Sequence, residues 1–184
     1  MRAESHNTLL LNPNAEPDQD PAAAAHIVRY AAQPDRAFAI ADLTPAYAHR
    51  ARKVTRGLAM LNRRQILVQD EVQSDLPTEV WWFLHTPAQV IVSDDGRSAT
   101  LSQGDKRLAA RILAPAAAKF AVMQARPLPT SPNPDGQNHN DGLRKLAVHL
   151  TAVTDLRLAV QLVPLEPGAT PPEPAPNIPA LQAW

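Results

Sequence analysis

The chain lacks several features that would have pointed to a particular chemistry. Its 184 residues include no cysteine, only 6 glycines and 4% aromatic residues. Without cysteine there is no disulfide framework, no thiol nucleophile and no cysteine metal site. So few glycines also argue against a glycine-rich phosphate-binding loop. Hydrophobic residues still make up 45% of the sequence, which is enough for a core built mainly from Ala, Leu and Val.

The chain also lacks net charge and long apolar runs. It has 18 Lys and Arg against 18 Asp and Glu, which excludes a strongly basic nucleic-acid surface and a polybasic membrane patch. A membrane-spanning helix needs about 18 consecutive apolar residues, and the sequence contains no such run. The opening residues contain no apolar stretch long enough for an export signal. We therefore expect neither a nucleic-acid partner nor a membrane.

Proline is abundant, with 19 residues, and gathers in two places. The first group lies within 127–142, a stretch without apolar periodicity that predicts a long, disordered loop. The second group predicts a disordered or polyproline-like tail. We therefore expect one domain over residues 1–165 and a disordered Pro-rich tail over 166–184.

The body of the chain predicts strands rather than helices. Short apolar or alternating segments recur between polar turns, as in Gln65 to Val72 and Lys106 to Leu113. In Leu156 to Val163, apolar side chains fall on one face and polar side chains on the other, which is typical of an antiparallel sheet with one buried face. About eleven such strands, spaced by turns, predict an all-β antiparallel sandwich.

No serine-nucleophile elbow, zinc-protease helix signature, phosphate loop or calcium loop is present. The remaining chemistry lies in three segments, around His6, Asp42 and His85. Two histidines and an aspartate from different strands can form the first ligand shell of Zn²⁺. His6, Asp42 and His85 are therefore candidate metal ligands, although their long spacings form no motif.

Each candidate also has a structural interpretation. His85 ends an aromatic strand and can be half-buried against backbone groups, Asp42 can accept hydrogen bonds from turn amides, and His6 can simply be exposed. Trp81 and Trp82 must point to opposite faces of their strand, so one is buried and the other faces outward. The outward one can stack on a sugar ring or lie under a loop.

An ordered set of segments resembles a known family. His6-Asn7-Thr8 is followed by Asp42 and Tyr47, then by a strand with Arg64, Val68, Asp70 and Val72, and then by Trp82-Phe83-Leu84-His85. In this order, over roughly residues 5–165, the segments resemble the C-terminal β-sheet domain of the heparinase II/III-like polysaccharide lyases.

The resemblance implies a two-part build, in which an α-helical toroid and a β-sandwich enclose a substrate groove. Such enzymes cleave uronic-acid-containing polysaccharides by β-elimination. The resemblance further implies a structural zinc site at His6, Asp42 and His85, or alternatively a groove-facing catalytic or substrate-contacting role for His6. It also implies a periplasmic or secreted setting.

The family's toroid carries most of its acid and base groups and has no counterpart in this chain. We therefore expect the β-sandwich part of a lyase, which binds an acidic polysaccharide and depends on a separate or missing toroid for catalysis. The alternative is a non-catalytic carbohydrate-binding or interaction module, in which an outward Trp and the Arg107/Arg111 pair hold a uronate chain. A third possibility is an open reading frame without a function of its own.

Overall fold

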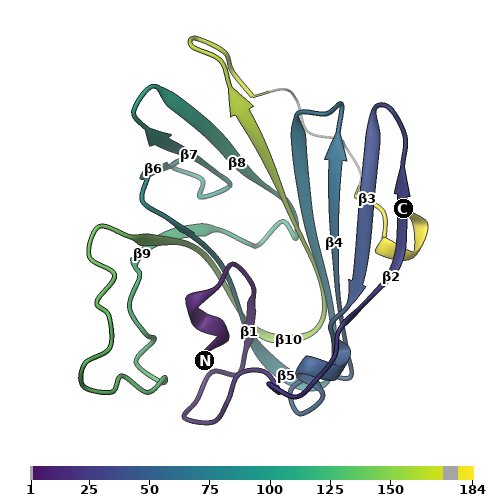
Figure 1. Cartoon of the computed structure of the whole chain (residues 1–184), viewed down its shortest axis with the longest axis vertical. Helices are drawn as coiled ribbons and strands as arrows, with labels where there is room; N and C mark the ends of the chain where they lie inside the picture. Colours follow the sequence, from purple (N-terminus) through teal and green to yellow (C-terminus); the bar gives the residue numbers. More distant parts are fainter. Residues whose placement is uncertain (1, 172–177) are drawn as a thin grey trace.

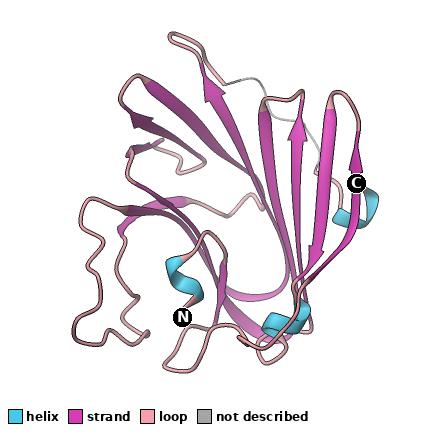
Figure 2. Cartoon of the chain, in the orientation of Figure 1, coloured by secondary structure: helices cyan, strands magenta, loops and turns pink. Residues whose placement is uncertain are grey.

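The computed structural model describes residues 2–171 and 178–184. It contains ten strands and three short 3₁₀ turns in those residues (Figure 2). The strands are β1 Leu9–Leu11, β2 His26–Ala32, β3 Arg36–Asp42, β4 Lys53–Leu61, β5 Gln65–Thr86, β6 Gln89–Val92, β7 Ser98–Gln103, β8 Lys106–Ala114, β9 Phe120–Gln124 and β10 Arg144–Leu165. The 3₁₀ turns are η1 Ala3–Ser5, η2 Thr44–Tyr47 and η3 Leu181–Ala183. No helix among them is long and apolar enough to cross a membrane.

All ten strands belong to one antiparallel hydrogen-bonded network, so the predicted all-β antiparallel class is confirmed. The main order is β2-β3-β4-β5-β10-β8-β7-β6, while β1 pairs with β5 and β9 pairs with β10. The two long strands curve through the molecule and are shared by two layers (Figure 1). The large layer contains β2–β4, β6–β8, the first half of β5 and the second half of β10. The small layer contains β1, β9 and the remaining halves of the two long strands.

The sequence pattern suggests about eleven separate strands, because β5 and β10 each appear in it as two short apolar segments separated by polar residues. Both strands bend where their pairing is interrupted. In β10 the register shifts between Leu150 and Asp155, and Ala152 has a φ of 56°. In β5 the facing segment contains Pro77, and the Thr78 hydroxyl donates to Ser74 Oγ at 3.0 Å. Bulges allow a strand to change direction without ending, so one sheet folds into a sandwich.

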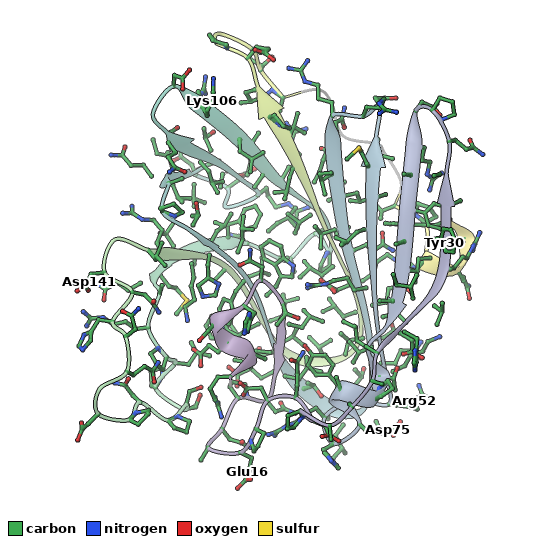
Figure 3. The ribbon with its side chains drawn as sticks, in the orientation of Figure 1. Glu16, Tyr30, Arg52, Asp75, Lys106 and Asp141 are labelled. Atoms are coloured by element: carbon green, nitrogen blue, oxygen red, sulfur yellow. The ribbon has the colours of Figure 1, made fainter. Side chains whose placement is uncertain are left out.

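The main core lies between the two layers. Large-layer residues such as Val72 and Leu158 pack there with small-layer residues such as Leu9, Trp82 and Phe120. Smaller clusters cover the outer faces: Leu181 and Trp184 lie over the large layer, while Ala3 and Leu128 lie over the small layer. Tyr30 lies on edge strand β2 at one end of the large layer, and Lys106 lies at the tip of the β7–β8 hairpin, toward the other end, where β6 is the edge strand (Figure 3).

The two Pro-rich segments need a correction. The loop between β9 and β10 is irregular, as expected, but its residues Leu128 and Ser131 are buried. The expectation of a disordered tail over 166–184 does not hold for residues 178–184, because Leu181 and Trp184 are buried against the sheet. Isolated apolar residues in a Pro-rich segment give no periodic signal, so sequence patterning missed this packing. Residues 172–177 of that tail lie outside the described residues.

Candidate functional site

The candidate site lies on the outer face of the small layer, where the His6-Asn7-Thr8 segment meets the end of β5. Trp81, Phe83 and His85 alternate with inward residues along β5 and face this side. His85 is directly opposite Lys145 in the pairing of β5 with β10. The 3₁₀ turn η1 and the β9–β10 loop cover the same face, since their residues Ala3 and Leu128 pack on Phe83.

Asn7 fixes the orientation of the His85 ring. Its side-chain oxygen accepts a hydrogen bond from the backbone N–H of His85 at 2.7 Å, and the same oxygen lies 3.2 Å from the ring nitrogen Nδ1. Because a backbone N–H can only donate, the Asn7 atom facing it must be the oxygen. Nδ1 must then carry a proton, which leaves Nε2 of the neutral ring as an acceptor.

The neutral form of this ring is favoured. The pKa of His85 lies below its ordinary value because partial burial disfavours the charged ring, and the positive charges of Lys145 and His6 act in the same direction. The negative charge of Glu4 opposes them more weakly. At neutral pH His85 is therefore an uncharged imidazole with an available lone pair.

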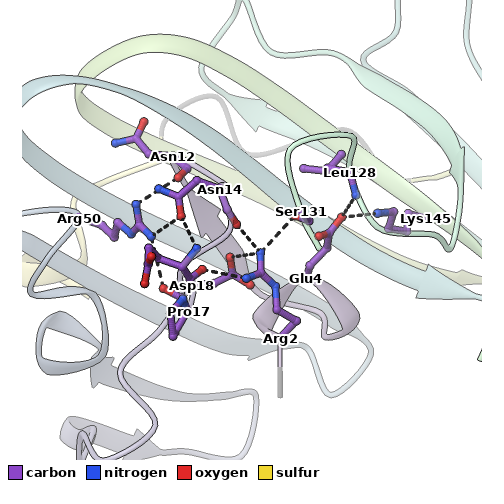
Figure 4. Close-up of polar contacts among 11 residues, drawn as sticks. Arg2, Glu4, Asn12, Asn14, Pro17, Asp18, Arg50, Leu128, Ser131 and Lys145 are labelled. Carbon is purple, nitrogen blue, oxygen red and sulfur yellow. Dashed lines mark hydrogen bonds and ion pairs between the residues drawn. The ribbon is translucent and has the colours of Figure 1, made fainter. Parts of the chain in front are cut away.

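Glu4 and Lys145 form a buried ion pair beside this ring. Their side chains are 5% and 1% exposed, and Lys145 Nζ lies 3.2 Å from Glu4 Oε1. Lys145 also donates to the Arg126 carbonyl at 2.8 Å and lies 4.4 Å from the centre of the Phe83 ring. Burial lowers the pKa of Lys145, and Glu4 partly opposes that shift. Since Glu4 also accepts from the Leu128 backbone N–H, the pair ties η1 and the loop to β10 (Figure 4).

A hollow of about 160 Å³ opens next to these groups. Its lining is mixed, because polar side chains alternate there with Ala125, Pro127, Pro132 and Leu143. It includes Arg2, Glu4, Ser5, His85, Arg126, Gln137, Asn140 and Lys145. A neighbouring hollow of about 340 Å³ is lined by Arg126, His139, Asn140, Asp141 and Arg144, among others. An imidazole acceptor surrounded by cations and amides suits a ligand that carries both hydroxyl and carboxylate groups.

The structure brings two of the three predicted metal ligands near each other. His6 is exposed and acts electrostatically on His85. Asp42 has other neighbours: its Oδ1 accepts from the Thr44 N–H at 2.9 Å, and hydrogen bonding to the Thr44 side chain, then to this N–H, with help from Lys53 and His26, lowers its pKa. In residues 2–171 and 178–184, no three His, Asp or Glu side chains are grouped so that they could hold a metal ion. The zinc site at His6, Asp42 and His85 therefore stays a prediction from the resemblance.

Two further residues of the family-like set, Asp70 and Tyr47, support β1 and the segment before it, together with Arg56, which lies outside that set. Arg56 donates to the Asn7 carbonyl at 2.8 Å and binds both carboxylate oxygens of Asp70. Tyr47 is buried, its hydroxyl donates to the Leu9 carbonyl at 2.8 Å, and burial raises its pKa. These contacts hold β1 and the preceding segment in place, so their role is to position Asn7 and His85.

The two tryptophans point to opposite faces, as predicted. Trp82 is buried in the main core. Trp81 faces outward and stacks on His149, with the ring centres 3.8 Å apart and the planes 7° apart. Glu79 Oε1 accepts from Trp81 Nε1 at 2.8 Å and lies 2.9 Å from His149 Nε2. One face of the Trp81 ring is thus covered by a neighbouring side chain.

Sequence reasoning missed Glu4 and Lys145. A lysine in the run Leu143 to His149 could have signalled a buried partner, because the alternation places Lys145 with Ala147, on the outer face that η1 and the β9–β10 loop cover. Glu4 gives no comparable signal, since it precedes the first strand in an irregular segment. Asn7 belonged to the recognised segment, but its bond to a histidine distant in sequence depends on the pairing of β1 with β5.

Comparison with known proteins supports the fold. No family model and no curated protein matches the sequence. The structure is similar to heparan sulfate lyase HepC from Pedobacter heparinus, with a TM-score of 0.68 and 14% identity over 94% of this chain. It is also similar to a heparinase III structure, with a TM-score of 0.65 and 13% identity over 89% of this chain. The expected heparinase-like β-domain fold is confirmed.

The extent of each match differs between proteins. This chain spans only 26% of the heparan sulfate lyase and 24% of the heparinase III. By contrast, the solved structure of HI1317 is matched over 87% of this chain and 81% of its own length, with a TM-score of 0.52 and 9% identity. The fold is therefore one part of a much longer polypeptide in the lyases, but most of the chain in HI1317.

Proposed function

We propose that this chain is the β-sandwich part of a polysaccharide lyase that acts by β-elimination on uronic-acid-containing polysaccharides. Its support is the match of 94% of the chain to a heparan sulfate lyase, together with the neutral His85 ring in a cationic hollow. Because the chain spans about a quarter of such lyases, we assign catalysis to an assembly that includes a further domain, the α-helical toroid implied by the resemblance.

The observation that carries the proposal is the bond between Asn7 and His85. β-Elimination removes a proton next to a carboxylate, so it needs a neutral base and positive charge near the carboxylate. Asn7 leaves His85 Nε2 as an acceptor, and Arg126 and Lys145 line the same hollow. In this proposal His85 contacts the uronate ring, the exposed Arg126 side chain holds its carboxylate, and the exposed His6 is a second imidazole at the entrance.

A test separates binding from chemistry. Heparan sulfate is mixed with the chain, binding is measured by calorimetry, and the unsaturated uronate product is followed by its ultraviolet absorbance. We expect measurable binding with little or no product from this chain alone. Absence of binding to heparan sulfate and to other uronate polysaccharides would contradict the proposal.

The alternative is a carbohydrate-binding or interaction module that takes no part in catalysis. The match of HI1317 over most of its length favours this alternative, since it provides a case in which the fold makes up nearly a whole chain. The two functions differ in one result. Adding the α-helical part of a lyase that assembles with this chain yields unsaturated product only under the lyase proposal.

A further inference from the structure

The outer face of the large layer is covered by the last residues of the chain. Residues 178–184 run across β3, β4, β5 and β10, and the short turn η3 lies near β2 and β3 (Figure 1). Leu181 and Trp184 are 3% and 6% exposed and pack against Ile40, Ala59 and Leu67. This segment therefore fills an apolar groove on the sheet.

The sheet holds this segment through its backbone as well as through its apolar side chains. Arg29 donates to the carbonyls of Gln182 and Trp184, Arg157 donates to that of Ile178 at 3.1 Å, and Gln69 donates to that of Pro179 at 2.9 Å. Glu71 accepts from the Leu181 N–H at 3.0 Å. Side chains of three strands, β2, β5 and β10, thus hydrogen-bond to the main chain of one short segment, as side chains do in peptide-binding sites.

The floor of the groove is shaped for the two anchor side chains. Gly57 lies in β4, opposite Gln69 of β5. A Cβ at this position would lie 2.9 Å from the Trp184 ring and closer still to Leu181. Glycine weakens the interior of a strand, and it often marks a place where another segment approaches the backbone closely. The ring edge of Trp184 also meets Phe38, with ring centres 6.1 Å apart.

We propose that this groove is a peptide-recognition site for an Ile-Pro-Ala-Leu-x-x-Trp segment, filled by the chain's own residues 178–184 and able to take the same segment from a second copy. The specificity comes from the two buried apolar side chains of the segment, from three sheet side chains that donate to its backbone carbonyls, and from Glu71, which accepts from one backbone N–H. In a single chain the covalent link makes the internal segment the favoured occupant. A second copy replaces it when the internal segment is displaced.

The test starts from the full, folded chain. A specific protease site is inserted at the exposed Gly168, the folded protein is cut there, and a fluorescently labelled peptide of residues 177–184 is added. Fluorescence anisotropy then measures binding of the peptide, and mass spectrometry after gel filtration measures whether the cut segment is retained. We expect the cut segment to be retained and to exchange saturably with labelled peptide.

The controls are placed in the peptide, because peptide changes cannot affect folding. Replacing either Leu181 or Trp184 by Ala in the peptide is expected to weaken binding by roughly tenfold or more, since each loses a buried anchor. Gly57→Leu in the chain should block the groove, whereas Gly104→Ala strains a turn with a φ of 59° but faces open space and should leave peptide binding unchanged. A cut segment that departs, with no binding of the labelled peptide to the folded remainder, would overturn the proposal. The uronate hollow lies on the small layer, so failure of either proposal leaves the other standing.

Discussion

Arg56 meets both carboxylate oxygens of Asp70, through Nε at 2.6 Å and Nη2 at 2.9 Å. Their side chains are 15% and 0% exposed. The pair joins β4 to β5, and the remaining Arg56 nitrogen holds the Asn7 carbonyl. A two-bond arginine–carboxylate pair fixes geometry more strongly than a single contact. It therefore supports the segment that orients His85.

Arg56→Met is expected to destabilise the fold by about 3–5 kcal/mol, because it leaves the Asp70 carboxylate buried without a partner. Chemical denaturation measures this loss. The matched control is Arg64→Met, which breaks the exposed pair with Glu166 and should cost about 1 kcal/mol or less. Equal losses for the two variants would mean that burial of the Arg56–Asp70 pair does not determine its contribution.

Asn7→Ala is expected to release the His85 ring while leaving the sheet intact. In the parent chain, nitrogen NMR of the ring should report a protonated Nδ1 and an unprotonated Nε2 at neutral pH. The variant should give a mixture of the two tautomers, because the oxygen that selects one of them is gone. An unchanged tautomer in a folded Asn7→Ala chain would remove Asn7 from its positioning role.

Asp18 predicts a pH dependence of stability with a defined sign. Its carboxylate is buried, and burial raises its pKa even though Arg2 Nη2 lies 2.9 Å away. A pKa that is higher in the folded chain contributes stability below the unfolded pKa of about 3.9, and this contribution is lost as pH rises through the folded pKa. Asp18→Asn should therefore become more stable relative to the parent as pH rises across that window, measured by denaturation at several pH values.

Asp95 is the control with the opposite sign. Its pKa is lowered by the hydrogen bond from the Ser93 hydroxyl, at 2.6 Å, and by the Arg97 N–H. Its contribution is present above the unfolded pKa and lost on acidification. Asp95→Asn should thus become less stable relative to the parent as pH rises. The same sign for both variants would contradict the assigned environments.

The zinc prediction has a direct elemental test. The described geometry, with Asp42 bound to its own turn and no three-ligand group, predicts only trace zinc after metal-replete expression. Removing structural zinc normally destabilises a protein strongly, so a chelator should leave the melting temperature unchanged if no zinc is bound. One zinc per chain, lost in Asp42→Ala and in His85→Ala, would instead restore the metal site implied by the resemblance.

The strands were largely predictable because their signals are local. The segments Lys106 to Leu113 and Leu156 to Val163, which the sequence pattern singled out, lie within β8 and β10. The continuity of β5 was not predictable, because Pro77 and the residues around it read as a break. A bend within a paired strand depends on its partner rather than on its own pattern.

The candidate site was predictable only in part. His6 and His85 were singled out and lie close enough to interact, but Asp42 does not join them. The contacts that define the site connect Asn7 to His85 and Glu4 to Lys145, residues far apart in sequence. Such contacts follow from strand pairing and loop packing, which no local pattern encodes.

The most direct test of the central claim compares the affinity of heparan sulfate for three chains. These are the parent, His85→Ala and His149→Ala. His85 lines the hollow, whereas His149 stacks on Trp81 and does not line the hollow. Calorimetry should give an affinity about tenfold weaker for His85→Ala, because one hydrogen bond to the uronate is lost, and an unchanged affinity for His149→Ala. Equal affinities for the parent and His85→Ala, or a loss confined to His149→Ala, would contradict the account.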